Sequence, residues 1–359
     1  MILVPQRYMM ALLNLMDDRV QVDAPLLHNT TLFTVNLAQA TAHIEGIIRS
    51  TAYRERRKQV EEQVRASLPE DTASQVLAEL PYYNRLREAF RTAGIVPPEN
   101  LGELERVLEQ ARQSNPARGG DIYYFAFDNN ALRNRLYSLY LKPTQRGRPE
   151  PNCLLAQAVR DELDTRKGKI LYEFLTSLDA AFPSVRIAKI FSNQNCLLDR
   201  LRLLALAEWN KILQSGNYEL VDAADDADAD GRIIESYAAF AATAGRKVVV
   251  LSSDNEFILR CGGRPNLIPQ LVRYRLEIDE AYKADWEAVS WLLYHLAVVY
   301  GRLDLRADDS TVRLYGVWQG KGAPDWDDER LKITVEPSNA PLEQALQRTM
   351  RILQAVGNP

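Results

Sequence analysis

The chain has 359 residues, of which 46% are hydrophobic and 26% charged, the balance of a globular protein with two or three domains. This composition excludes disordered, fibrous and membrane-embedded classes. A formal net charge of −4 argues against a protein that coats nucleic acid non-specifically, although an acidic site and local basic patches can share one surface.

Residues 1–118 are predicted to form an all-helical region. Apolar residues recur at helical spacing over residues 32–64, and no β-branched run of strand character interrupts the region. A second helical pattern covers residues 73–93, with a break expected at Pro81. A third helix is expected to begin after Pro98.

Residues 119–275 instead alternate strand and helix patterns. Residues 122–127 are a continuous β-favouring run, typical of a strand buried on both faces of a parallel sheet. Helices are expected over residues 154–178, 196–213 and 232–244. Further strands are expected over residues 218–221, 247–251 and 267–272, the last at a sheet edge because of Pro269. The alternation predicts an α/β domain with a mostly parallel sheet.

Residues 276–359 are predicted to form a separate, small α/β domain. A helix over residues 281–300 precedes strands over 311–317 and 331–335, with an exposed loop between the strands at 319–325. A final helix is expected over residues 341–356.

Cysteine and histidine usage narrows the possible chemistry. The three cysteines and three histidines show no CxxC pair and no metal-ligand spacing. A disulfide framework, a structural zinc site and histidine-dependent catalysis are therefore not expected. No apolar run is long enough to cross a membrane and no signal peptide is evident, so we expect a cytoplasmic protein without membrane contact. A catalyst of this composition must use its carboxylates.

Four acidic residues stand out, and three of them lie at element ends where a parallel sheet could place its binding crevice. Asp128 follows the first buried strand, and Asp254 follows the strand over residues 247–251. Asp230 lies near the start of a helix, and Glu162 lies on a helix. Because ligands of open α/β sheets bind at the carboxyl ends of the strands, we expect these side chains to meet in one pocket.

The order and context of these acids resemble the PIN-like superfamily of metal-dependent nucleases, in its larger PIN type, and are also compatible with the related NYN branch. The resemblance rests on four elements: Phe127-Asp128-Asn129-Asn130, Glu162-Leu163-Asp164-x-x-Lys167, Asp230-x-x-Ile233 and Ser252-Ser253-Asp254-Asn255. It implies a three-layer α/β/α domain over residues 119–275. It also implies hydrolysis of phosphodiesters that leaves 5′-phosphate and 3′-hydroxyl ends.

The resemblance also implies roles for individual residues. Asp128, Glu162, Asp230 and Asp254 are the predicted catalytic and metal-binding residues, with Asp228 as the alternative to Asp230. Two further residues, Ser252 and Asn129, are expected to hold these acids in place through hydrogen bonds.

Four converging carboxylates require a counter-charge. Two unit charges about 4 Å apart repel by roughly 4 kcal/mol at an effective dielectric near 20. Without a bound cation, some of these groups would have to be protonated. The sequence predicts Mg²⁺ or Mn²⁺ as the cofactor, because hard cations prefer oxygen ligands and the site offers neither thiolate nor imidazole.

Two other interpretations of these acids are weaker. The segment from Asp226 to Gly231 copies the start of an EF-hand calcium loop, but Tyr237 stands where that loop needs a bidentate Glu. A solvated acidic run before a helix explains the segment better. A phosphatase of the haloacid dehalogenase type needs a second Asp two residues after the first, where this chain has Asn130.

A basic stretch follows the first strand and has two tyrosines interleaved with it. It comprises Arg133, Arg135, Lys142, Arg146 and Arg148, with Tyr137 and Tyr140. The stretch is typical of nucleic-acid binding, with phosphate contacts and base stacking. It is equally typical of a solvated helix face over core tyrosines, and both interpretations stay open.

The function predicted from the sequence is a cytoplasmic, Mg²⁺- or Mn²⁺-dependent nuclease, with single-stranded RNA favoured over DNA as the partner. The alternative is a catalytically silent PIN-like module that binds RNA or a partner protein. A homo-oligomer or a regulatory partner is compatible with either function.

Overall fold

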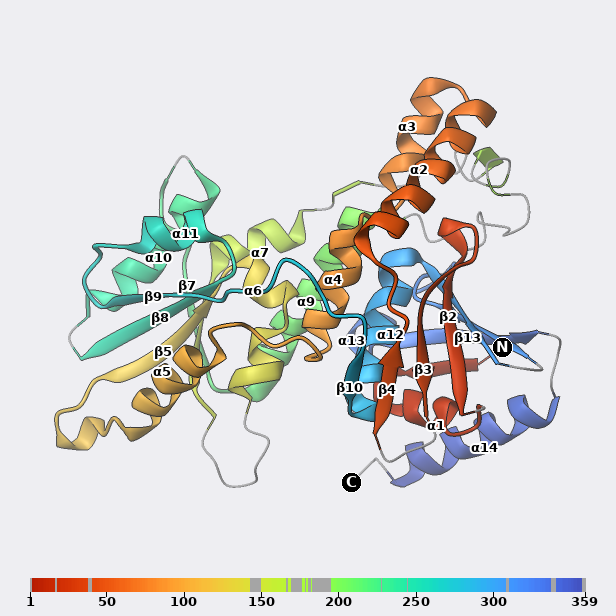
Figure 1. Ribbon diagram of the computed structural model, residues 1–359. Coiled ribbons are helices and arrows are strands. Elements are labelled where there is room, and N and C mark those ends of the chain that lie inside the picture. Colours follow the sequence, from red (N-terminus) through yellow and green to blue (C-terminus); the bar gives the residue numbers. More distant parts are fainter. Residues whose placement is uncertain are drawn as a thin grey trace. The chain divides into compact units, whose positions relative to one another are not determined.

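The computed structural model describes residues 2–16, 18–37, 41–142, 150–165, 167–168, 195–226, 228–243, 245–307, 310–336 and 340–356, together with residues 176, 177, 179 and 182. The chain forms two compact units, each built from separate stretches of sequence (Figure 1). Unit 1 comprises Met1–Ile95, Lys167–Arg200 and Glu277–Pro359, and unit 2 comprises Val96–Arg166 and Leu201–Leu276.

Unit 1 contains an eight-stranded antiparallel sheet with the order β1-β13-β12-β11-β2-β3-β4-β10. The first and last strands along the chain are paired, so both ends of the sequence contribute to one sheet. Its strands are β1 (Ile2–Pro5), β2 (Arg19–Ala24), β3 (Thr30–Asn36), β4 (Ala42–Glu45), β10 (Tyr282–Ala284), β11 (Arg302–Arg306), β12 (Thr311–Tyr315) and β13 (Arg330–Glu336).

Helix α12 lies at the centre of unit 1, because every residue from Val289 to Tyr300 is buried. It packs against α4 and β11. The α-helices of the unit are α1 (Met9–Leu13), α2 (Ser50–Ser67), α3 (Glu70–Ala78), α4 (Tyr83–Thr92), α12 (Trp286–Tyr300), α13 (Ala323–Asp327) and α14 (Ala340–Val356). No helix in the described ranges is long and apolar enough to cross a membrane.

The prediction of an all-helical N-terminal region is wrong for its first part, where four strands precede α2. In β2, Val20 and Val22 are buried and alternate with more exposed residues, which is the period of a strand. In β3, Leu32, Phe33 and Val35 also fit one turn of a helix, so this short apolar run did not discriminate between the two structures. The prediction of a break near Pro81 is confirmed by the gap between α3 and α4.

The prediction of a separate C-terminal domain is also wrong. Strands β11, β12 and β13 share a sheet with β1 and β2, a long-range pairing that no local pattern reveals. The expected helix over residues 281–300 begins with strand β10, and β11 was not predicted. The expected exposed loop holds Lys321, which is buried with its ammonium group against the Trp326 ring at 3.8 Å from the ring centre.

Unit 2 contains five parallel strands in the order β7-β6-β5-β8-β9. They are β5 (Ile122–Phe127), β6 (Asn152–Ala156), β7 (Tyr218–Val221), β8 (Arg246–Ser252) and β9 (Leu267–Leu271). The helices are α5 (Leu101–Gln113), α6 (Asn129–Arg133), a π-helical turn (Tyr137–Leu141), α7 (Gln157–Asp164), α10 (Ala229–Ala241) and α11 (Asn255–Cys261). Helix α9 (Leu197–Ser215) starts in the last residues of a unit 1 segment and continues into unit 2.

Helices cover both faces of β5, the central strand. The Tyr123 hydroxyl accepts a hydrogen bond from Gln110 of α5 at 3.0 Å, whereas the Tyr124 ring packs edge-on against Phe240 of α10 with centroids 4.8 Å apart. Successive strand residues point to opposite faces, so α5 and α10 lie on opposite sides of the sheet. The predictions of a doubly buried first strand and of an edge position for Pro269 are confirmed.

Two boundaries of unit 2 differ from the predicted ones. The expected helix over residues 154–178 begins instead as strand β6, whose buried Leu154 and Leu155 carry no β-branched signal. Residues 169–175 of that prediction lie outside the described residues. The unit also begins at Val96 rather than at residue 119, because Leu104 and Leu108 of α5 belong to its core.

A close backbone approach in unit 1 makes Gly316 a sensitive position. A β-carbon at this residue would overlap the Ala297 carbonyl group and the Val298 amide nitrogen of α12. We expect Gly316→Ala to lower the free energy of unfolding by more than about 2 kcal/mol, because backbone atoms cannot move aside as side chains can.

Denaturant titration followed by circular dichroism measures this change. The matched control is Gly102→Ala in α5, where a β-carbon meets open space. This control should be neutral or stabilising by about 0.5–1 kcal/mol, as expected for a helical position. Equal stability of the Gly316 variant and the wild type would contradict the close approach.

Candidate active site

The sheet of unit 2 has a switch point between β5 and β8. From β5 the chain steps to β6 and β7 on one side, and then crosses to β8 and β9 on the other. In open α/β sheets, ligands bind at the carboxyl ends of the strands at such a point. Asp128 directly follows β5, and Asp254 follows β8 by two residues. The sequence therefore places two acids at the position that this topology favours for a ligand.

Asp128 is a buried carboxyl group, with only 5% of the residue exposed. One of its oxygens accepts a hydrogen bond from the Ala131 amide at 2.6 Å, which caps α6. The other accepts from the Ser252 hydroxyl at 2.5 Å. Burial, with a smaller contribution from the negative charge of Asp254, raises the pKa of Asp128 to about 6 against the opposing effect of these hydrogen bonds.

Ser252 connects the two acids at the switch point. Its hydroxyl donates to Asp128 and accepts a hydrogen bond from the Asp254 amide at 2.8 Å. The Asp254 carboxylate in turn accepts from the amides of Glu256 at 2.9 Å and Phe257 at 3.3 Å, which fixes the start of α11. The predicted positioning role of Ser252 thus has a geometric basis, since its hydroxyl contacts both the Asp128 carboxylate and the Asp254 backbone amide.

Asp230 and Asp228 lie at the start of α10, beyond the carboxyl end of β7. Asp228 caps this helix by accepting from the Gly231 amide at 3.3 Å. Burial raises the pKa of Asp230, and the charges of Asp228 and Asp254 contribute to the increase. Asp254 therefore lies within electrostatic reach of both Asp128 and Asp230.

Glu162 joins this end of the sheet through Asn129. It lies on α7, which directly follows β6, and its carboxylate accepts a hydrogen bond from the Asn129 side-chain amide. The Asn129 side-chain oxygen is itself buried and has no hydrogen-bond partner. Such an orphaned acceptor is costly unless a donor or a cation completes it.

The donor set fits a hard divalent cation in its chemistry. Every candidate ligand is an oxygen, from the carboxylates and from the unsatisfied Asn129 amide. Within the described residues, however, no three His, Cys, Asp or Glu side chains stand close enough together to hold a metal ion. An ion would therefore have to draw the carboxylates at this edge inward.

The segment before α10 does not form an EF-hand. It follows strand β7 rather than a helix, so the helix–loop–helix arrangement is missing. The Asp226 carboxylate accepts a hydrogen bond from the Asp228 amide at 3.0 Å, which is a local turn contact before the helix.

The basic stretch after β5 divides into separate environments. Arg133 is half-buried and donates to Asn130 at 3.0 Å, and Lys142 is exposed. Arg135 has a left-handed backbone with φ of 55°. Tyr137 is buried and the partly buried Tyr140 packs against the core, which favours the interpretation as core tyrosines. Arg146 and Arg148 lie outside the described residues.

Arg260 is a candidate site residue that the sequence reasoning missed. Its guanidinium donates to the carboxylates of Asp228 and Asp230. It lies on α11, the helix that Asp254 caps. A basic residue within one or two turns of a candidate ligand, on the same short helix, is the sequence signal that could have identified it.

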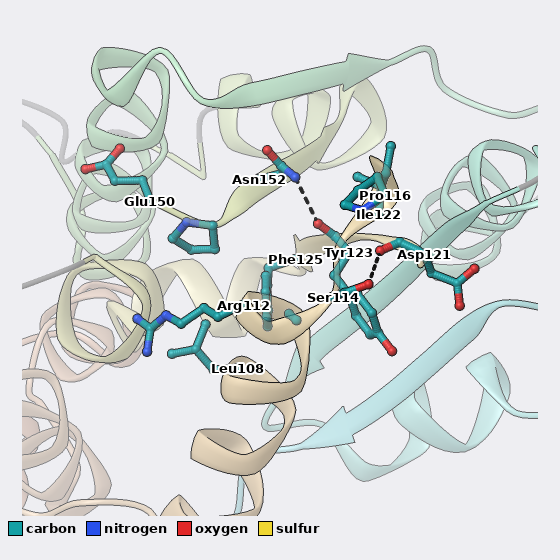
Figure 2. A pocket seen from close by; sticks show the side chains of 12 residues that line it. Leu108, Arg112, Ser114, Pro116, Asp121, Ile122, Tyr123, Phe125, Glu150 and Asn152 are labelled. Carbon is teal, nitrogen blue, oxygen red and sulfur yellow. Dashed lines mark hydrogen bonds between the residues drawn. The ribbon is translucent and has the colours of Figure 1, made fainter. Parts of the chain in front are cut away.

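Unit 2 also has a cavity at the opposite end of the sheet, beside the first residues of β5 and β6 (Figure 2). Its volume is about 230 Å³, and its lining includes Arg112 of α5 and the first residues of β5 and β6. Asn152 and Ser114 donate to backbone carbonyls in its wall, at 3.2 and 2.6 Å. None of the candidate acids lines it. We therefore place the candidate active site at the carboxyl ends of the strands, where the acids lie, and not in this cavity.

Comparison with protein-family models, curated proteins and solved structures found no match.

The raised pKa of Asp128 predicts a cost to stability near neutral pH. Between pH 3.8, the ordinary value, and about 6, the folded protein binds more protons at Asp128 than the unfolded chain does. Stability from this group is therefore present at low pH and lost as pH rises through about 6. Asp128→Asn removes the buried charge and should raise the free energy of unfolding at pH 7.5 by about 1–3 kcal/mol.

This gain should disappear near pH 4, where both proteins are uncharged at this position. Denaturant titrations at the two pH values, in the presence of a chelator, measure the difference. A variant that is less stable than the wild type at pH 7.5 would contradict the burial of an ionised carboxyl group.

Proposed function

We propose that unit 2 is a Mg²⁺- or Mn²⁺-dependent nuclease with a PIN-like three-layer fold, whose active site lies at the carboxyl ends of β5, β6, β7 and β8. The observation that carries the proposal is the hydrogen-bonded connection from Asp128 through Ser252 to Asp254 across the switch point. A buried carboxyl group with a raised pKa beside other acids is typical of functional sites.

Four of the five parallel strands lead into one part each of the proposed site. Asp128 and Asp254 would bind the metal, and Asp230 would add a third carboxylate from α10. Glu162, oriented by Asn129, would supply a further oxygen from α7. When bound, the metal would supply charge stabilisation for the phosphodiester displacement.

The protein's own residues would orient the metal-binding carboxylates. Ser252 keeps the Asp128 carboxylate oriented, and the amides at the start of α11 orient Asp254. The remaining exposure of Asp254 and Asp230 leaves this edge accessible to a polynucleotide. Single-stranded RNA is the proposed substrate, on the resemblance of the motifs alone.

A cleavage assay tests the proposed function. Labelled single-stranded RNA and DNA are incubated with Mn²⁺ and either the wild type or Asp128→Asn. We expect the substitution to lower the cleavage rate roughly a hundredfold or more, the usual cost of removing one preorganised electrostatic group.

The matched control is Asp225→Asn, an exposed acid that precedes the α10 cap and has no role in the proposed site. Its rate should equal that of the wild type. Cleavage by Asp128→Asn at the wild-type rate would point to another site or to a contaminant. Binding of RNA without cleavage by the wild type would favour the silent module instead.

Thermal stabilisation by Mn²⁺ tests the metal site separately from activity. An ion that binds only the folded state stabilises it by about 2.7 kcal/mol at a hundred times its Kd. Asp254→Asn should remove this stabilisation, while the amide side chain still caps α11. Differential scanning fluorimetry with a metal titration and a chelator reversal measures the effect. An equal shift in both proteins would argue against Asp254 as a ligand.

A further inference from the structure

Arg260 places a positive charge directly on the acidic edge of unit 2. One of its guanidinium nitrogens contacts Asp228, and the other contacts Asp230 at 3.4 Å. The side chains of Arg260, Asp228 and Asp230 are 37%, 51% and 46% exposed, so the three groups meet at the surface and can rearrange. The contact with Asp228 is the closer one.

The charges around Asp230 explain why the Arg260 guanidinium lies beside it. The carboxylates of Asp228, Asp254 and Glu256 all act on Asp230, and Arg260 is the cation that offsets them. A divalent ion at this edge would meet the same negative groups. The guanidinium and the ion would therefore be attracted to one carboxylate and would repel each other.

We propose that Arg260 competes with the divalent cation for Asp230, and that Asp228 serves to hold Arg260 rather than to bind metal. This inference rests on the proposed metal site. It assigns distinct roles to two acids that the sequence leaves interchangeable. Asp230 exchanges Arg260 for the ion, and Asp228 retains the guanidinium beside the site. The Arg260 guanidinium thereby makes the affinity of the site for the divalent ion lower than it would be with the carboxylates alone.

A double-mutant cycle on metal affinity tests this assignment. Mn²⁺ binding to chelator-stripped protein is measured by the loss of the free-ion electron paramagnetic resonance signal. The proteins are the wild type, Arg260→Gln, Asp228→Asn and the double variant. Circular dichroism spectra and unfolding midpoints establish that each is folded.

Arg260→Gln should bind Mn²⁺ about three- to tenfold more tightly, because a repelling charge is removed. Asp228→Asn should bind it more weakly, because the guanidinium then pairs with Asp230 alone. Asp228→Asn should weaken binding much less in the Arg260→Gln background than in the wild type, since Asp228 acts mainly through Arg260. The matched control is Arg264→Gln, three residues beyond the end of that helix, whose guanidinium donates to Glu235 and to the Arg260 carbonyl oxygen. It should bind Mn²⁺ like the wild type.

Unchanged or weaker binding by Arg260→Gln would overturn the proposal, and so would an effect of Asp228→Asn that is equally large with and without Arg260. Asp254→Asn separates this failure from that of the proposed function. If Asp254→Asn weakens Mn²⁺ binding but Arg260→Gln leaves it unchanged, only the proposed competition is overturned. Absence of Mn²⁺ binding in the wild type, or binding insensitive to Asp254→Asn, overturns the metal site and the competition together.

Discussion

The hydrogen bond between Ser252 and Asp128 is the interaction on which the candidate site depends. It joins the carboxyl ends of β5 and β8, the two strands that flank the switch point, inside a buried environment. Without it, the Asp128 carboxylate would keep the Ala131 amide as a donor but lose its connection to the next strand. The same hydroxyl accepts from the Asp254 amide, so one small side chain fixes the spacing of two acids.

Much of unit 2 could be predicted from the sequence because its signals are local. The continuous apolar run of β5, the acid that follows it and the edge position of Pro269 are each encoded within a few residues. Strand β6 was missed because leucine and alanine fit a helix equally well. The spacing of Arg260 from Asp254 shows only that a basic residue lies near a candidate ligand; its pairing with Asp228 and Asp230 depends on how α10 and α11 come together, which the spacing does not specify.

Unit 1 was harder to predict for a related reason. Its sheet alternates strands from the two ends of the sequence, and β2 pairs with β11 across more than two hundred intervening residues. The individual strands are short, and the half-exposed ones carry mixed polar and apolar residues. Patterns of this kind identify a strand only when its partner is known, and the partner here is distant in sequence.

The pairing of β1 with β13 also sets an order of assembly during synthesis. Unit 2 is complete once the ribosome has passed Leu276, whereas the sheet of unit 1 still lacks β10 to β13 at that moment. Domains tend to fold as they emerge, so unit 2 can fold before β10 to β13 are available to complete the sheet of unit 1. A folded insertion shortens the effective loop that β1 and β13 must close, which lowers the entropic cost of the last pairing. Until then β1 lacks its partner β13 and β2 lacks β11, so both strands present an unpaired edge in the nascent chain.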